Sequence, residues 1–144
     1  MSTSRNSRRK SASSGSSPAR GPVPERHNRR YGLRGEDLAA AWYADHGYDV
    51  VARNWRCREG EVDLVVARPG EIVFCEVKAR SSDRYGLPAE AVTPAKQRRL
   101  RGLAARYLAD AQEGSAPPVA PGAVVRFDVA AVLGGRVEVI EAAF

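Results

Sequence analysis

The sequence predicts one mixed α/β (α+β) domain, in which helices flank a mixed central sheet. Three observations predict it: two helical patterns lie on either side of three strand-like segments, a Pro-Gly turn interrupts a β-branched stretch, and a Gly-Gly pair separates two further apolar segments. The expected order is therefore α-β-β-β-α-β-β. A length of 144 residues suits a single domain.

The first 30 residues differ in composition from the rest of the chain. They hold eight basic side chains against one acid, or +7, and residues 31–144 hold fifteen basic and sixteen acidic side chains, or −1. The net charge of +6 therefore comes from the tail and not from the folded part. We expect residues 1–30 to be a disordered basic tail and 31–144 to be one domain. The tail either holds nucleic acid loosely through phosphate charge or is a solvated appendage.

Both helices are predicted from apolar spacing and end signals. A stripe over Leu33–His46 has the spacing of an amphipathic helix, and Gly47 is placed to end it. Thr93 and Pro94 are typical of an N-cap and a first helical residue, and the Gly/Pro-rich loop Gly114–Gly122 closes the second helix. The apolar positions that support the second helix are Leu100, Leu103, Ala104, Tyr107 and Leu108.

Five segments are expected to be strands. They are Tyr48–Arg56, Glu61–Arg68, Glu71–Arg80, Ala123–Leu133 and Arg136–Glu141. Pro69-Gly70 makes the second and third a hairpin. If this turn is symmetric, opposed residues have numbers that add to 139, which places Asp63 opposite Glu76 and Glu61 opposite Lys78. A loop of odd length would shift this register by one.

Asp63, Glu76 and Lys78 form the combination that indicates chemistry. Opposed carboxylates on one face of a hairpin would have Cβ atoms about 4.5–5.5 Å apart, an arrangement that is destabilising by itself. Such a pair favours a shared proton or a divalent cation, and Mg²⁺ prefers carboxylate and water oxygens. Lys78, two residues past Glu76, returns to the same face, where its ammonium could orient the attacking water. The alternative is a polar face with incidental ion pairs such as Glu61–Lys78.

The pattern Asp63…Glu76-x-Lys78, which follows a helix carrying Glu36, resembles the PD-(D/E)xK nuclease superfamily. More closely, the chain is similar to the YraN-type bacterial family of predicted endonucleases from about Tyr31 to its C-terminus. The motifs that carry this resemblance are G-E-D-L-A-A (35–40), N-W-R (54–56), G-E-V-D-L-V (60–65), F-C-E-V-K-A-R (74–80) and T-P-A-K-Q-R-R-L (93–100). Val62 stands where the superfamily name has proline.

The resemblance implies a restriction-endonuclease-like core that depends on Mg²⁺ or Mn²⁺. It implies that Asp63, Glu76 and the backbone carbonyl of Val77 bind the metal. Lys78 would then position the nucleophilic water, and Glu36 would assist as an accessory ligand or water-holding acid. Archaeal Holliday-junction resolvases look like relatives with the same helix-one glutamate. They act as dimers, so a homodimer is one state that the analogy allows, while the sequence itself leaves the oligomeric state open.

Four residues are candidate contacts to nucleic acid: Arg80, Lys96, Gln97 and Arg56. Arg80 continues the face of Glu76 and Lys78, although an arginine at a strand end is more often solvated. Lys96 and Gln97 open the second helix, where N-termini favour phosphates. The stem of Lys96 would alternatively cover the edge of the core.

We therefore expect a nuclease that hydrolyses phosphodiester bonds, with DNA favoured over RNA. Two alternatives stay open: a nucleic-acid-binding module that keeps the nuclease fold without catalysis of its own, and a small adaptor with a non-catalytic acidic hairpin. No apolar segment approaches the roughly 20 residues of a membrane span, so we expect a soluble cytoplasmic protein without a membrane partner. Cys57 and Cys75 are expected to be reduced thiols.

Overall fold

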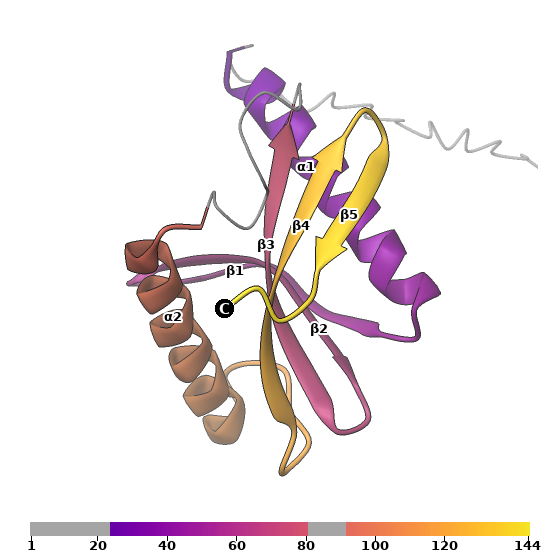
Figure 1. Cartoon of the computed structure of the whole chain (residues 1–144). Helices are drawn as coiled ribbons and strands as arrows, with labels where there is room; N and C mark the ends of the chain where they lie inside the picture. The colour runs from indigo at the N-terminus through magenta and orange to yellow at the C-terminus, as the bar shows by residue number, and fades with distance from the viewer. Residues whose placement is uncertain (1–23, 81–91) are drawn as a thin grey trace, which may run out of the picture.

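The computed structural model describes residues 24–80 and 92–144, with side chains from Gly35 to Ala79 and from Val92 onward (Figure 1). The order of elements is α-β-β-β-α-β-β, as predicted. The elements are α1 (Pro24–Asp45), β1 (Asp49–Cys57), β2 (Gly60–Arg68), β3 (Glu71–Arg80), α2 (Pro94–Glu113), β4 (Val124–Leu133) and β5 (Arg136–Ile140).

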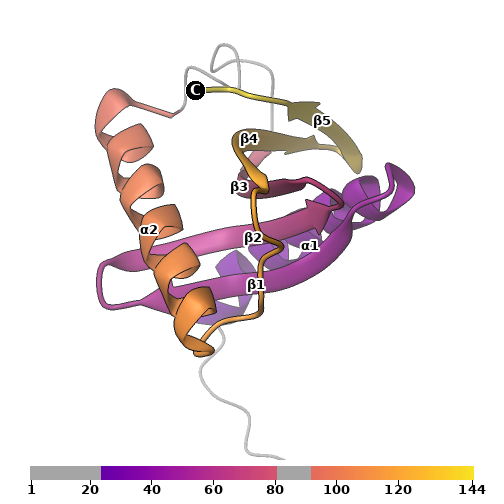
Figure 2. The same ribbon diagram turned by 90° about the horizontal axis from the view of Figure 1, so that it is seen from below.

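The strands form one mixed sheet in the order β1-β2-β3-β4-β5. β3 and β4 are parallel, and the other neighbouring pairs are antiparallel. Parallel neighbours need a long crossover connection, which α2 supplies between β3 and β4. Figures 1 and 2 show α1 and α2 on opposite faces of the sheet. The predicted fold class is therefore confirmed.

Each helix covers its own apolar core. The α1-side core consists of Ala39, Ala40, Tyr43, Tyr48, Leu64, Val66, Val73, Cys75 and Ala130. The α2-side core consists of Val62, Val65, Ile72, Phe74, Val92, Leu100, Leu103, Ala104, Tyr107, Phe127 and Val129. A sheet that is buried on both faces needs nearly continuous apolar strands, which explains the β-branched runs of β2, β3 and β4.

The second helix has the predicted ends. The hydroxyl of Thr93 accepts a hydrogen bond from the Lys96 backbone N–H at 3.3 Å, and Pro94 is the first helical residue. Gly114 ends the helix with φ of 82°, in the left-handed region that glycine adopts without strain. The N-cap therefore places Lys96 in the first turn of the helix.

The first helix is longer than its apolar stripe predicted, since it begins at Pro24 and not at Leu33. Residues 24–30, which we expected in the tail, are helical, and 1–23 lie outside the described residues. The observed strands begin and end within one residue of the expected positions. In the described ranges, no helix combines the length and the apolarity needed to cross a membrane. Cys57 and Cys75 are both free.

Candidate functional site

The β2–β3 hairpin has the predicted register. Its paired residues run from Arg68 and Glu71 to Leu64 and Cys75, and the numbers in each pair add to 139. Asp63 and Glu76 come next in this register, just beyond the last pair of the ladder. The Glu76 carboxylate lies close enough to Asp63 to raise the pKa of that carboxyl. The hairpin therefore brings together the two acids that the sequence singled out.

Asp63 occupies an irregular position in β2. Residues two apart on a regular strand share a face, yet Val62 packs in the α2-side core and Leu64 in the α1-side core. In the neighbouring strand, Asn54 has a positive φ of 49° at the matching position, between the pairs Trp55–Val62 and Arg53–Leu64. The alternation is therefore broken at Asp63.

The irregularity lets the Asp63 side chain take the place of a ladder hydrogen bond. Its Oδ2 accepts from the backbone N–H of Val77 at 2.9 Å. The N–H and C=O of one strand residue point to the same side, so the carbonyl of Val77 also faces β2. The pairing of β2 with β3 ends at Leu64 and Cys75, so the Val77 carbonyl lies beyond the paired region of the two strands.

Lys78 joins the two acids from the same strand as Glu76. Its Nζ lies 3.2 Å from Oε1 of Glu76, and the two side chains are only 26% and 14% exposed. Glu61, the alternative partner, instead pairs with Arg56 at 3.0 Å. The ion pair of the site is thus Glu76–Lys78.

Glu36 reaches the edge of the site from α1. Its Oε2 accepts a hydrogen bond of 2.7 Å from Nδ2 of Asn54, the residue with positive φ beside Asp63. Its charge acts on Asp63. Glu36 is therefore close enough to affect the acid pair, and its hydrogen bond to Asn54 of β1 holds it there.

The four residues expected to contact nucleic acid do not lie together in the structure. Lys96, on the first turn of α2, lies close enough to Lys78 for the Lys78 ammonium to affect the pKa of Lys96. The side chain of Gln97 instead donates from Nε2 to the carbonyl of Val92 at 3.1 Å. Arg80 ends β3, and its side chain lies outside the described residues.

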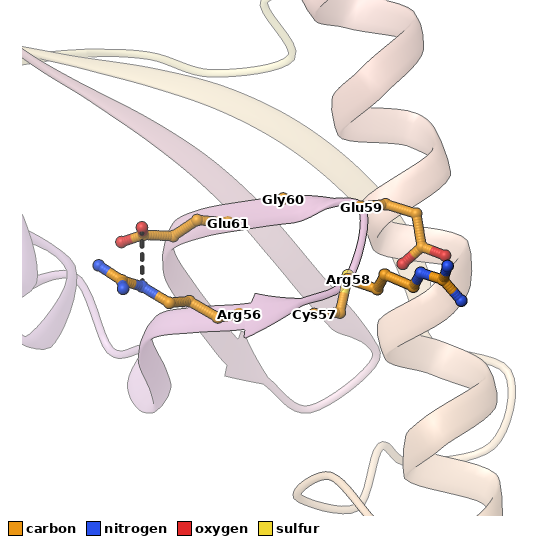
Figure 3. Close-up of a pocket in the computed structure, with 6 residues that line it drawn as sticks. All are labelled: Arg56, Cys57, Arg58, Glu59, Gly60 and Glu61. Atoms are coloured by element: carbon orange, nitrogen blue, oxygen red, sulfur yellow. Dashed lines mark ion pairs between the residues drawn. The ribbon is translucent and has the colours of Figure 1, made fainter.

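Arg56 belongs to a different pocket, at the β1–β2 turn (Figure 3). There Arg56 faces Glu61, whereas Arg58 and Glu59 extend towards α2. The pocket is lined by residues 56–61 and includes neither Asp63 nor Glu76. Among the four candidates, the structure brings Lys96 to the acid pair and leaves Arg56 at the turn.

Known proteins share this part of the chain. Residues 35–132, which include every described site residue named above, match the model of the uncharacterised protein family UPF0102. The chain belongs to this family. It is 52% identical to a UPF0102 protein of Frankia casuarinae over 68% of this chain and 77% of the relative. UPF0102 proteins of Rhodococcus jostii (47% identical; 76% and 87% covered) and Symbiobacterium thermophilum (50%; 75% and 86%) are also similar.

In this UPF0102 protein the acid pair holds a proton unusually tightly. Burial and the neighbouring Glu76 carboxylate raise the pKa of Asp63 to about 7, against the lowering effect of the Val77 N–H. Burial also raises the pKa of Glu36, where the Asn54 hydrogen bond opposes it and Glu61 adds to it. The raised pKa values mean that the described neighbours do not fully compensate the negative charge of these carboxylates.

The pKa values of Lys78 and Lys96 are shifted in opposite directions. Burial works to lower the pKa of Lys78, but its neighbours, including the Glu76 and Asp63 carboxylates, outweigh it and raise the pKa. The nearby Lys78 ammonium lowers the pKa of Lys96. The site thus brings two carboxyl groups and two amines near enough for their charges to shift the pKa values of Asp63, Lys78 and Lys96.

The donor set of the site fits a hard divalent cation. Across residues 24–80 and 92–144, no three or more His, Cys, Asp or Glu side chains are grouped so that they could hold a metal ion. Mg²⁺ needs fewer, because it binds through one or two carboxylates and keeps several waters. The Val77 N–H takes Oδ2 of Asp63, so Oδ1 is the oxygen that Asp63 could offer to a cation, and the Val77 carbonyl faces the same strand. A bound cation would offset the repulsion between the two carboxylates.

Sequence reasoning missed a second charged group, in β4. Asp128 is fully buried and accepts hydrogen bonds from Arg126 (2.8 Å to each oxygen), the Tyr43 hydroxyl (2.6 Å) and the Ala142 N–H (3.0 Å). Arg126 also pairs with Glu71. The available signal was an Arg-x-Asp within the apolar run of β4, since a charge buried in a strand is paired.

Proposed function

We propose that this UPF0102 protein is a metal-dependent nuclease that hydrolyses phosphodiester bonds of nucleic acid, with DNA as the favoured substrate. The observation that carries the proposal is the meeting of Asp63 and Glu76 at the end of the β2–β3 ladder, with Lys78 paired to Glu76. A stable fold gains nothing from two adjacent carboxylates unless a proton or cation lies between them.

Asp63, Glu76 and the Val77 carbonyl would hold Mg²⁺ or Mn²⁺. When bound, such an ion lowers the pKa of a coordinated water and polarises the phosphoryl oxygen. The Val77 N–H fixes the orientation of Asp63 through Oδ2 and leaves its other oxygen for the ion. The arrangement supports placing this chain in the PD-(D/E)xK superfamily, whose Asp…Glu-x-Lys pattern it carries.

Lys78 would position the attacking water. Its amine lies against Glu76 on the largely buried side of the sheet, so its location is defined before substrate binds. Glu36, held by Asn54, would receive or orient a proton of that water from the α1 side. Burial raises the pKa of Glu36 above its usual value, which favours uptake of a proton by this carboxylate.

The test is cleavage of branched, flapped, duplex and single-stranded DNAs with Mg²⁺ or Mn²⁺. We expect wild-type protein to cut at least one of them, and Lys78→Ala to be slower by about 10²–10⁴-fold. Asp45→Asn, which removes an exposed carboxylate at the end of α1, is the control and should cut normally. If wild type and Lys78→Ala bind DNA but are equally inert on every substrate, the protein is a binding module and the proposal fails.

A further inference from the structure

The positive charge of the domain is gathered on one helix. Residues 92–109, which include most of α2, contain five basic side chains and no acid. The other residues of 31–144 contain ten basic and sixteen acidic side chains. This stretch therefore carries +5, whereas the rest of the domain carries −6. Its basic residues are Lys96, Arg98, Arg99, Arg101 and Arg106.

The four arginines of this stretch face away from the core. The buried residues of α2 are Leu100, Leu103, Ala104 and Tyr107. The exposed residues include Arg98, Arg99, Arg101 and Arg106, which we call the α2 arginine face. Figure 2 shows α2 on the outside of the sheet, on the face opposite α1. Arg106 pairs with Asp110 at 3.0 Å, and none of the other three arginines has an ion pair with a residue that the structure describes.

The charges of α2 are the reverse of those that stabilise a helix. The peptide dipoles favour acids in the first turn of a helix and bases in the last. The first turn of α2 contains Lys96 and no acid, and the last turn contains Glu113 and no base. Arg98 and Arg101 are also neighbours of like charge on the helix surface. Helix stability therefore does not explain this placement of charge, whereas an anionic partner would.

Gly102 lies among the arginines of this face. Arg98, Arg99 and Arg106 are three or four residues away, so they surround it on the helix surface. Glycine is the least favourable residue in a helix apart from proline. Its backbone is not in the left-handed region, and a Cβ at this position would meet no described atom within 4 Å. Neither conformation nor packing requires this glycine, but a partner that approaches the helix backbone closely would.

The composition of the face favours nucleic acid over an acidic protein. Interfaces between proteins have an apolar or aromatic centre, whereas interfaces with nucleic acid are more polar and strongly basic. In the described ranges, the exposed large hydrophobic residues are Val50, Val124 and Val125, none of which belongs to α2. The α2 arginine face thus offers charge without an apolar anchor.

We propose that the α2 arginine face binds the sugar-phosphate backbone of the nucleic-acid substrate, beside the segment that is cut. This inference rests on the proposed nuclease function for the identity of the partner. Each guanidinium group presents a fork of N–H donors that matches the oxygens of a phosphate. A nucleic-acid backbone repeats its charge at regular intervals, so several arginines on one helix contact successive phosphates.

The salt dependence of binding measures these contacts directly. Full-length protein is titrated in EDTA into a fluorescein-labelled DNA duplex, at several salt concentrations between about 50 and 200 mM. For duplex DNA, the slope of log affinity against log salt changes by about 0.9 for each phosphate contact. Arg99→Gln should therefore reduce the slope by about 0.9, and Arg98→Gln/Arg99→Gln should reduce it by about 1.8. At the lowest salt, the double variant should bind about tenfold or more weakly.

Arg136→Gln is the matched control for charge. It removes one exposed arginine from β5 and should leave the salt slope unchanged. The basic N-terminal region is the same in every variant, so its own contacts to DNA do not affect the difference in slope. Glutamine is a good helix former, which keeps α2 intact in the two arginine variants.

Gly102→Leu tests close approach without removing charge. Leucine favours the helix more than glycine does, so this variant should unfold at a higher urea concentration. Its side chain should nevertheless hold the DNA away from the helix and weaken binding about tenfold, the effect of losing one charge-assisted hydrogen bond. Gln112→Leu, at an exposed position in the last turn of α2, is its control and should bind as wild type does.

Equal salt slopes in wild type, Arg99→Gln and Arg136→Gln would overturn the proposal. Equally tight binding of polyglutamate would indicate an acidic protein as the partner and would overturn it too. Normal binding by Gly102→Leu would refute the contact at Gly102. Because no cleavage is measured, these results leave the nuclease proposal standing. Conversely, a protein that is inert on every DNA but binds the duplex through α2 would contradict the nuclease proposal and retain this surface.

Discussion

Asp63 in β2 and Asp128 in β4 are aspartates of one sheet in opposite electrostatic settings. Asp128 receives two N–H donors from Arg126, one hydroxyl and one backbone N–H, so its charge is compensated inside the fold. Asp63 receives a single backbone N–H and lies against a second carboxylate, Glu76. The comparison separates a carboxylate whose charge is compensated within the fold from one that lies against a second acid.

The same contrast distinguishes a structural ion group from a functional one. A buried pair that is fully hydrogen-bonded is strongly destabilising to break, but it offers no free oxygen to a ligand. Two adjacent carboxylates raise the free energy of the folded protein. Their oxygens are also available to bind a cation. Removing the charge at the two positions should therefore change stability in opposite directions.

Removing Asp128 should have the largest effect. Asp128→Ala leaves Arg126, whose side chain is 15% exposed, without its principal partner. We expect a loss of about 3–5 kcal/mol in the free energy of unfolding, measured by urea denaturation. Asp110→Ala is the matched control, because it breaks an ion pair with the half-exposed Arg106 and should cost less than about 1 kcal/mol. Equal losses in the two variants would contradict this interpretation of Asp128.

Neutralising Asp63 should stabilise the metal-free protein. The pKa of this carboxyl is raised from 3.8 to about 7, so the folded chain binds the proton more tightly than the unfolded chain. Stability therefore falls as pH rises from about 4 to 7, and the loss is complete above 7. Asp63→Asn should be more stable than wild type by about 1–3 kcal/mol at pH 7.5 in EDTA.

This gain should shrink as the pH falls towards 4 and should vanish only below the unfolded-state pKa of 3.8, where wild-type Asp63 is protonated in both states. Urea denaturation at the two pH values measures it. Asp45→Asn, at an exposed position, should show no such pH-dependent gain. A destabilised Asp63→Asn at pH 7.5 would show that the carboxylate is balanced within the protein, as Asp128 is.

Removing one donor from Asp128 should have a smaller effect than removing the acid. Tyr43→Phe deletes the hydroxyl that donates to Oδ2 at 2.6 Å and leaves the ring in place. We expect a loss of about 1–2 kcal/mol in thermal or urea unfolding. Tyr107→Phe is the comparison, since its hydroxyl lies 3.5 Å from the Pro117 carbonyl and should contribute less. A larger loss for Tyr107→Phe would argue against a special role for the Asp128 network.

The smallest expected effect is stabilisation by the metal itself. Mg²⁺ at about fivefold above its dissociation constant should add about 1 kcal/mol to the unfolding free energy of wild type at pH 7.5. Asp63→Asn should lose this increment, whereas Tyr43→Phe should keep it, because the network around Asp128 offers no ligand. Calorimetric titration with Mg²⁺ and thermal unfolding both measure it. An increment that survives in Asp63→Asn would place the ion elsewhere.

The sequence by itself determined the elements and the register of the hairpin. The Thr93-Pro94 and Gly114 signals act within one helical turn, and Pro69-Gly70 fixes which residues of two adjacent strands face each other. Such preferences depend on neighbours along the chain, so they can be read without the fold. This is why Asp63 and Glu76 could be paired in advance.

Only the tertiary structure decided how the site is completed. The break in alternation at Asp63 lies beside Asn54 in another strand, and Lys96 comes near Lys78 because α2 connects the parallel strands β3 and β4. The partners of Asp128 come from α1, β4 and the C-terminal segment. Contacts between segments far apart in sequence depend on how the elements pack, and no local pattern encodes them. The two acids and Lys96 were therefore candidates from the sequence alone, but the position of Lys96 relative to the acids and the balanced Asp128 were not predicted.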